Sequence, residues 1–192
     1  MLQKKQKVPS VPFAGKSAKQ IVKDIHHNLK MLKNNMLNFF LLVFIFVIDR
    51  LSKIYILGLD EIINGNTISV NKFLNLELVW NRGVAFGILS FQESFWYNII
   101  TILIFVIIII LIYLIFSSSG FKKYSYIAVC GGALGNVFDR ILYNSVPDFI
   151  DLNYNDFHWF IFNVADIFIT IGVFCLIFDE IIIEKYKNEK NK

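Results

Sequence analysis

The sequence is poor in charge and in cysteine. Only 18% of its 192 residues are charged, whereas a soluble domain carries about 25%. With two cysteines, Cys130 and Cys175, the chain is not a disulfide scaffold. With 56% apolar residues it is not a disordered chain. Its net charge of +4 is unevenly spread, so it lacks the distributed basic face of a nucleic-acid binder. What remains is an integral membrane protein with one compact domain.

Four long apolar stretches dominate the rest of the sequence. Each is close to the length of about 20 residues that crosses a bilayer, and they cover 36–59, 95–116, 124–143 and 159–183. The second is the cleanest, because 99–116 contains no charge. We therefore predict an all-α integral membrane protein, a four-transmembrane-helix bundle.

Basic residues predict the orientation of these spans. The head, the second loop and the tail together carry fourteen lysines, and the first and third loops carry one lysine and one arginine. Because basic loops stay in the cytoplasm, we expect both termini there and the first and third loops outside. The predicted parts are a lysine-rich cytoplasmic extension (1–35), a four-span membrane domain (36–184) and a cytoplasmic tail (185–192). The lysines of the extension would hold it at the anionic inner leaflet or leave it disordered.

The first loop has a pattern of its own. Residues 71–89 read NKFLNLELVWNRGVAFGIL, and the first part alternates apolar and polar residues as a half-buried strand does. The sequence Asn81-Arg82-Gly83 then interrupts the pattern like a turn. We predict a small extracytoplasmic β-sheet in this loop.

Charged residues inside the predicted spans require an explanation, because each costs a few kcal/mol or more. Residue counting places Asp139 roughly 6 Å and Asp166 roughly 10 Å inside the outer ends of their spans. Asp148 follows the third span at the outer surface, and Asp49 precedes Lys53 by four residues, the favourable order for a helical ion pair. Charges from three spans and one loop are thus expected in the outer half of the membrane.

Spacing groups these polar residues further. Asn136 and Asp139 are three residues apart, as are Asn163 and Asp166, so each pair is expected on one helix face. Arg140 is four residues after Asn136. Small residues one turn earlier favour close helix packing that would position this cluster; they are Gly131, Gly132 and Gly135.

Two carboxylates in a partly dry site share one proton, so one can activate a water while the other protonates a leaving amine. Candidates are Asp139, Asp148 and Asp166, and spacing leaves open which two act. We expect no metal or other cofactor, because the histidines lack metal-ligand spacing with any cysteine or glutamate. A proton-coupled transporter using intramembrane carboxylates is the alternative function, and a non-enzymatic assembly factor is a third.

Five motifs decide among these alternatives by resemblance. They are D-x-x-x-K from Asp49, NRGVAFG (81–87), GGALGNVFDR (131–140), VPDFID (146–151) and FNVADIFITIG (162–172). Together, in this order and with four spans, they resemble signal peptidase II, the bacterial lipoprotein signal peptidase. The resemblance implies an aspartyl protease of the cytoplasmic membrane. It would cut the signal peptide from diacylglyceryl-modified prolipoproteins just before the lipid-bearing cysteine.

The resemblance also assigns residues. The catalytic pair would be Asp148 and Asp166. Supporting and substrate-binding roles would fall on Asn136, Asp139, Arg140, Asn163, Asn81, Gly83, Asp49 and Lys53. Arg82 and Val84 depart from the family pattern, where a small hydroxyl residue and alanine are common. Besides the prolipoprotein, the expected partner is membrane lipid, with no nucleic acid, and the protein is expected to be a monomer.

Overall fold

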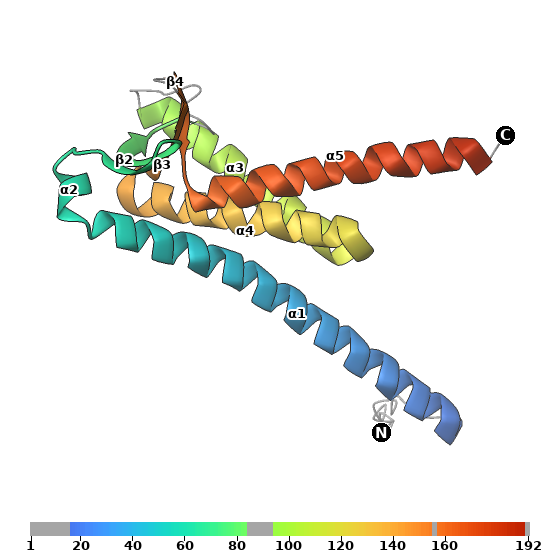
Figure 1. The fold of residues 1–192 in the computed structure, drawn as a ribbon. Coiled ribbons are helices and arrows are strands. Elements are labelled where there is room, and N and C mark those ends of the chain that lie inside the picture. The colour runs from blue at the N-terminus through green and yellow to red at the C-terminus, as the bar shows by residue number, and fades with distance from the viewer. Residues whose placement is uncertain (1–15, 84–93, 155–156, 191–192) are drawn as a thin grey trace, which may run out of the picture. The chain divides into compact units, whose positions relative to one another are not determined.

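The computed structural model describes residues 16–83, 94–154 and 157–190. The chain forms two compact units, Met1–Phe39 and Phe40–Lys192, and the boundary falls within the long helix α1 (Ala18–Leu57). Figure 1 traces the chain from α1 through a short helix α2 (Asp60–Ile63) to the strands and the later helices.

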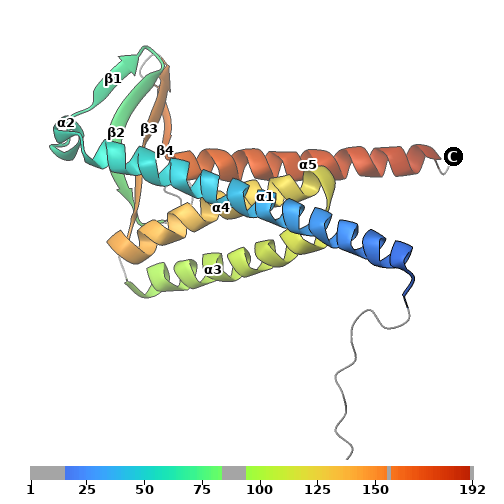
Figure 2. The ribbon, with the colours of Figure 1, turned by 90° about the horizontal axis from the view of Figure 1, so that it is seen from below.

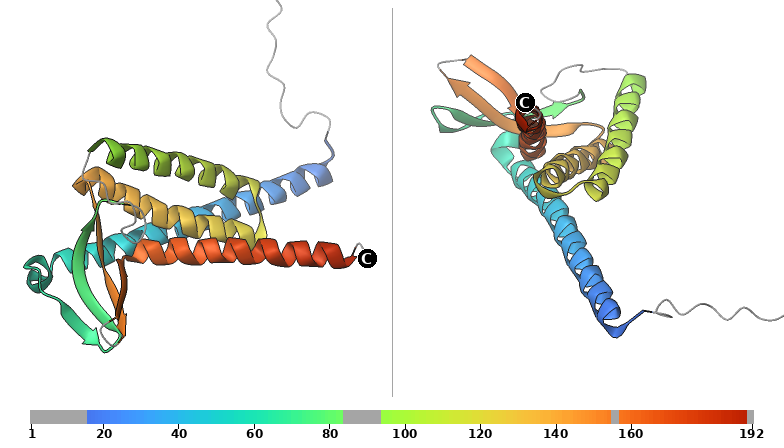
Figure 3. Two further views of the ribbon diagram at one scale, coloured as in Figure 1. Left: turned by 90° about the horizontal axis from the view of Figure 1, so that it is seen from above. Right: turned by 90° about the vertical axis from the view of Figure 1, so that its right-hand side faces the viewer.

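Three helices follow the first pair of strands. They are α3 (Ser94–Ser117), α4 (Gly120–Tyr143) and α5 (Val164–Lys190). A two-residue connection joins α3 to α4, and Gly120 adopts a φ of 62°, which glycine tolerates at no steric cost. Figures 2 and 3 show α4 lying between α3 and α5. Because α4 lies between two other helices, many of its residues are buried.

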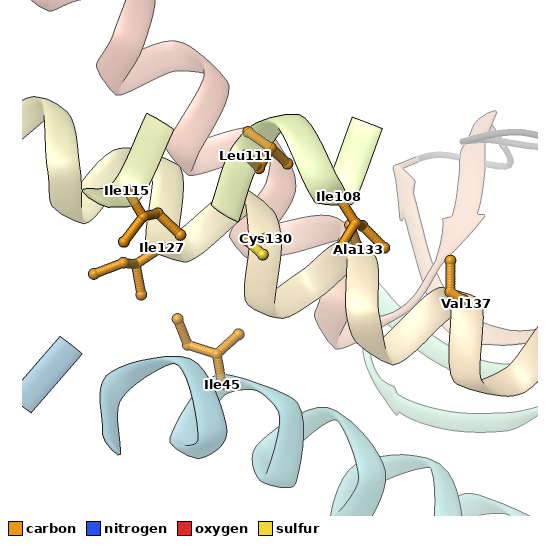
Figure 4. Packing of buried hydrophobic residues seen from close by; sticks show 8 residues of the cluster. All are labelled: Ile45, Ile108, Leu111, Ile115, Ile127, Cys130, Ala133 and Val137. Carbon is orange, nitrogen blue, oxygen red and sulfur yellow. The ribbon is translucent and has the colours of Figure 1, made fainter. Parts of the chain in front are cut away.

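An apolar cluster fills the space between α1, α3 and α4. Figure 4 shows Ile45 of α1 facing Ile127 and Cys130 of α4, with α3 on the other side. Its buried members are Ile45, Ile108, Leu111, Ile115, Ile127, Cys130, Ala133 and Val137. Small residues bring the helix backbones together, since a Cβ on Gly131 would lie 2.9 Å from an Ile45 methyl. The glycines of the third predicted span therefore do lie at close helix contacts.

The antiparallel sheet has four strands in the order β1-β2-β3-β4. The strands are β1 (Ile68–Asn71), β2 (Leu74–Asn81), β3 (Val146–Tyr154) and β4 (Phe157–Phe162). The strand expected in the first loop is confirmed as β2. The expectation that the sheet belongs to the first loop alone is wrong, because the third loop contributes β3 and β4, and β2 pairs with β3.

Two predicted spans have different bounds in the structure. The fourth was expected to begin at Trp159, but 157–162 form strand β4 and α5 begins at Val164. An aromatic and apolar run such as FHWFIF suits either a strand or a span, and pairing of Ile161 with Asp151 in β3 settles it as a strand. At the other end of the chain, α1 begins at Ala18, well before the first predicted span.

By length and composition, one helical segment among the described residues is apolar enough to cross a membrane, Tyr97–Ser117. It overlaps the second predicted span, 95–116, except at Ser117. α1, α4 and α5 have the length of spans but carry the charged residues noted in the sequence.

Candidate active site

The two carboxyl groups assigned to catalysis sit on different elements. Asp148 is the third residue of β3, opposite Val79 of β2, and is 2% exposed. Asp166 is the third residue of α5 and is 6% exposed. Asp166 therefore lies in the first turn of its helix, and the expected depth of about two turns within a span is wrong because α5 begins later than predicted.

Asn163 connects these two carboxyl groups. Its side-chain amide donates to Asp148 Oδ1 at 2.5 Å. Its backbone N–H donates to Asp166 Oδ2 at 3.3 Å, and its side-chain oxygen accepts from the backbone N–H of Asp166 at 3.2 Å. This reciprocal pairing is a capping box at the start of α5. One residue thus caps the helix and contacts both carboxyl groups, Asp148 through its side chain and Asp166 through its backbone N–H.

The capping box also corrects the meaning of one motif. Asn163 and Asp166 were expected on one face of a helix, but Asn163 lies just before α5. The spacing of three residues is right for both arrangements, since a helix face and a capping box share it. In α4 the expectation is correct. Asn136 and Asp139 both lie within the helix, three residues apart, and both are buried.

Asn136 links the carboxyl pair to a charged cluster behind it. Its amide donates to Asp166 Oδ1 at 2.9 Å, and its oxygen accepts from Lys53 Nζ at 3.0 Å. Lys53, only 1% exposed, also donates to Asp139 at 2.6 Å and forms an ion pair with Asp49 at 2.9 Å. Lys53 therefore orients the amide that contacts Asp166.

Arg50 is a member of this cluster that the sequence analysis missed. Its guanidinium makes a two-armed contact with Asp139, at 2.5 and 2.7 Å, and also contacts Asp49 at 3.0 Å. The available signal was a second cation beside Asp49 and three residues before Lys53, inside an apolar stretch. Because Asp139 is bound by Arg50 and Lys53, it is the least free of the three candidate carboxylates.

The other side of the site is formed by the end of β2. Asn81 donates from its amide to Asp148 Oδ2 at 2.8 Å and accepts from the backbone N–H of Gly83 at 2.7 Å. Arg140 donates to the Gly83 carbonyl at 2.5 Å and to the Asn136 carbonyl at 3.3 Å. Arg140 and Asn81 thus hold the chain after β2 against the acids. Arg82 is exposed, and Val84 lies outside the described residues.

Burial sets the charge state of the site. Burial and the neighbouring Asp166 charge raise the pKa of Asp148 to about 6, although hydrogen bonds from Asn81 and Asn163 act in the opposite direction. The network contains four carboxyl groups, those of Asp49, Asp139, Asp148 and Asp166, and the three cations of Arg50, Lys53 and Arg140. One proton on the Asp148–Asp166 pair would make the whole network neutral.

A further buried acid, Asp151, lies on β3 and was not assigned a role. It accepts from Asn75 at 3.2 Å and pairs with a ring nitrogen of His158 at 2.8 Å. Within the described parts of the chain, no three histidine, cysteine, aspartate or glutamate residues are arranged to hold a metal ion. The side chains that surround Asp148 and Asp166 are the amides of Asn81, Asn136 and Asn163 and, further away, buried cations.

Comparison with known proteins agrees with this arrangement. The family model described as signal peptidase (SPase) II matches residues 41–182. The chain belongs to the signal peptidase II family.

Similar proteins and a solved structure support the same family. A lipoprotein signal peptidase of Pelagibacter ubique is 51% identical over 161 residues, which cover 83% of this chain and 97% of that protein. One of Anaplasma marginale is 34% identical over 148 residues, 76% of this chain and 85% of that protein. A solved bacterial membrane enzyme at 37% identity has a TM-score of 0.62 and covers 81% of this chain and 90% of its own.

Family membership makes the chain an aspartic-type peptidase and places it among bacterial membrane enzymes. The alternative function as a proton-coupled transporter finds no support in these comparisons. The family match begins at residue 41 and so leaves out the whole first unit, Met1–Phe39.

Proposed function

We propose that Asp148 and Asp166 are the catalytic pair of this peptidase. The observation that carries the proposal is Asn163, which donates to both acids and so keeps the two carboxyl groups close together. In this pair the ionised carboxylate takes a proton from water, and the water attacks the scissile carbonyl. The protonated partner gives its proton to the leaving amine.

The surrounding residues position this pair. Asn136 holds Asp166, Asn81 holds Asp148, and Arg140 fixes Gly83 at the rim of the site. Lys53 acts on the catalytic pair indirectly, because it orients Asn136. Its charge is balanced by ion pairs with Asp49 and Asp139. Family resemblance gives substrate-binding roles to the same set, and their contacts with the acids support such roles.

The substrate is a prolipoprotein that carries a diacylglyceryl group, cut just before the lipid-bearing cysteine. The names of the relatives support this substrate. Large apolar side chains exposed on α3 support a lipid surrounding; among them are Phe105, Ile109 and Tyr113. Four spans, α1, α3, α4 and α5, would cross the cytoplasmic membrane once each as a monomer. Both termini would be cytoplasmic, and the sheet and the site would be at the outer face.

Cleavage of a matched pair of precursors tests this function. Purified protein in detergent is given a prolipoprotein with a diacylglyceryl-modified cysteine, or the same precursor without the lipid. We expect a shorter lipid-modified product from the first, with the cysteine at its new amino terminus by mass spectrometry, and none from the second. Equal cutting of both would overturn the lipid requirement, and no cutting of either would overturn the peptidase assignment.

A further inference from the structure

The first half of α1 carries an apolar stripe that precedes the residues matched by the family model, 41–182. Its members follow one another at alternating steps of three and four residues, which places them on one helix face. They are Val22, Ile25, Leu29, Leu32 and Met36, with between 47% and 66% of each residue exposed. This stripe belongs to the unit Met1–Phe39.

The charges of this segment are almost all positive. Between residues 16 and 39 there is a single acid, Asp24, which pairs with Lys16 at 2.5 Å. Four exposed lysines remain, Lys19, Lys23, Lys30 and Lys33. An exposed apolar stripe with lysines beside it is the pattern of a helix that lies on anionic lipid headgroups.

A second copy of the chain fits the stripe poorly. The spacing matches a coiled-coil seam, with Val22, Leu29 and Met36 alternating with Ile25 and Leu32. The flanking positions on one side are Lys19, His26 and Lys33, and those on the other are Ile21, Asn28 and Asn35. Such seams are stabilised by acids facing lysines, and neither flank offers an acid. Paired copies would bring lysine against lysine or asparagine.

Length gives an independent reason for a second environment along α1. At 1.5 Å per residue its 40 residues measure about 60 Å, twice the thickness of about 30 Å of a bilayer's hydrocarbon core. Half of the helix therefore lies outside the hydrocarbon if the other half crosses it.

We propose that residues 18–36 bind the surface of the membrane that α1 enters, through anionic lipid headgroups. A helix that crosses a bilayer and also lies along its surface must bend between the two parts, and the boundary between the compact units, at Phe39–Phe40, falls within α1. The stripe lies at the boundary of headgroups and acyl chains, and the lysines contact lipid phosphates. The proposal rests on the proposed function in one respect, that α1 crosses the membrane. It concerns a surface apart from the active site, so it is tested separately from cleavage.

Hydrogen–deuterium exchange of the whole protein provides the test. Nanodiscs that hold one copy each exclude self-association, and they are made either of phosphatidylcholine or of phosphatidylcholine with about a third phosphatidylglycerol. We expect backbone amides of 18–36 to exchange about tenfold more slowly in the anionic discs. Equal exchange in the two lipids would overturn the proposal, as would slowing that appears only in a separate preparation of discs holding two copies.

Matched variants show whether the stripe and the lysines carry the effect. Leu29→Asp places a charge in the stripe, and Asn34→Asp adds the same charge on the opposite face. We expect Leu29→Asp and Lys33→Gln to lose the slowing and Asn34→Asp to keep most of it. Loss in all three, or in none, would contradict the proposal. Precursor cleavage in the same discs reports on the proposed function independently.

Discussion

At the scale of single residues, Asn163 makes three contacts that organise the site. It caps α5 and donates to Asp148, and its backbone N–H contacts Asp166. The amide side chain serves both contacts, because its oxygen accepts at the cap and its NH2 group donates to Asp148. The sequence identified Asn163 as a partner of Asp166 by spacing, but the link to Asp148 depends on the approach of β3 to α5. That approach is a long-range contact and leaves no local pattern.

The pH dependence of cleavage is predicted to respond to Asn81. As pH rises through about 6, Asp148 loses the proton that the pair shares, so activity should fall on the alkaline side. The Asn81 amide favours the ionised form, and its removal in Asn81→Ala should raise the pKa of Asp148. We therefore expect the alkaline limb of kcat/KM against pH to move to higher pH.

Asn75→Ala is the matched control for this shift. Asn75 lies on the same strand and also donates to a β3 aspartate, but that aspartate is Asp151. The alkaline limb of kcat/KM against pH for Asn75→Ala should lie at the same pH as that of the unmodified protein. An unmoved limb in Asn81→Ala, or a shift to lower pH, would show that Asn81 does not tune the pair.

Lys53→Met is predicted to destabilise the fold strongly. Lys53 is buried and contacts Asp49, Asn136 and Asp139, so its loss leaves two carboxylates to share Arg50. Breaking a buried ion pair costs about 3–5 kcal/mol of unfolding free energy. The comparison is Lys122→Met, which removes an exposed pair with Glu180 and should leave stability unchanged. Denaturant unfolding in detergent measures both, and equal stability of the two variants would refute the cluster's structural role.

At the scale of elements, apolar content predicted the helices and missed half of the sheet. The stretches 95–116 and 124–143 became α3 and α4 with nearly the expected bounds, because a long apolar run has few alternatives to a helix. The strands β3 and β4 were read as a loop and as the beginning of a span. Their sequences are VPDFIDLNY and FHWFIF. They form strands because β3 pairs with β2 and with β4, and sequence spacing alone does not reveal this pairing.

Close packing of α4 against α5 is predicted to depend on Gly132. A Cβ at this position would lie 2.5 Å from the Ala165 carbonyl oxygen and 2.9 Å from Ile169, so the helices must separate. Gly132→Ala should therefore cost about 1–3 kcal/mol of stability. Gly132→Ala should also lower kcat, because a shift of Ala165 would displace its neighbour Asp166.

Gly58→Ala serves as the comparison for this helix contact, because a Cβ there meets only the carbonyl oxygens of Ile54 and Tyr55, at 3.4 Å. Thermal unfolding should show a lower midpoint for Gly132→Ala and little change for Gly58→Ala. An unchanged midpoint in both would mean that α4 and α5 adapt to the extra methyl group without cost.

At the scale of the whole molecule, the distribution of lysines predicts the topology. Head, second loop and tail are basic, and the loops that build the sheet are not. Tags placed at the two ends of the chain should therefore both be protected from protease in intact cells and digested after lysis. A tag in the loop between β1 and α2 should be digested in intact cells. Opposite exposure of the two ends would contradict a four-span arrangement.

Family, fold and site were thus accessible from sequence to different degrees. Motif order predicted the family, which the comparisons confirm. The residues assigned by resemblance come together in one hydrogen-bonded network, from Asp49 to Asp148, although they are spread over five elements, α1, β2, α4, β3 and α5. Arg50 was missed because no motif position pointed to it, and only its geometry shows that it neutralises Asp139.

Cleavage by carboxyl-to-amide variants tests the central claim most directly. Asp148→Asn and Asp166→Asn each remove one acid from the pair while keeping its size, and Asp60→Asn makes the same change at an exposed position in α2. With purified, folded proteins and the lipid-modified precursor, we expect product formation to be at least about 10³-fold lower in the first two variants and unchanged in the third. Normal cleavage by either Asp148→Asn or Asp166→Asn would contradict it.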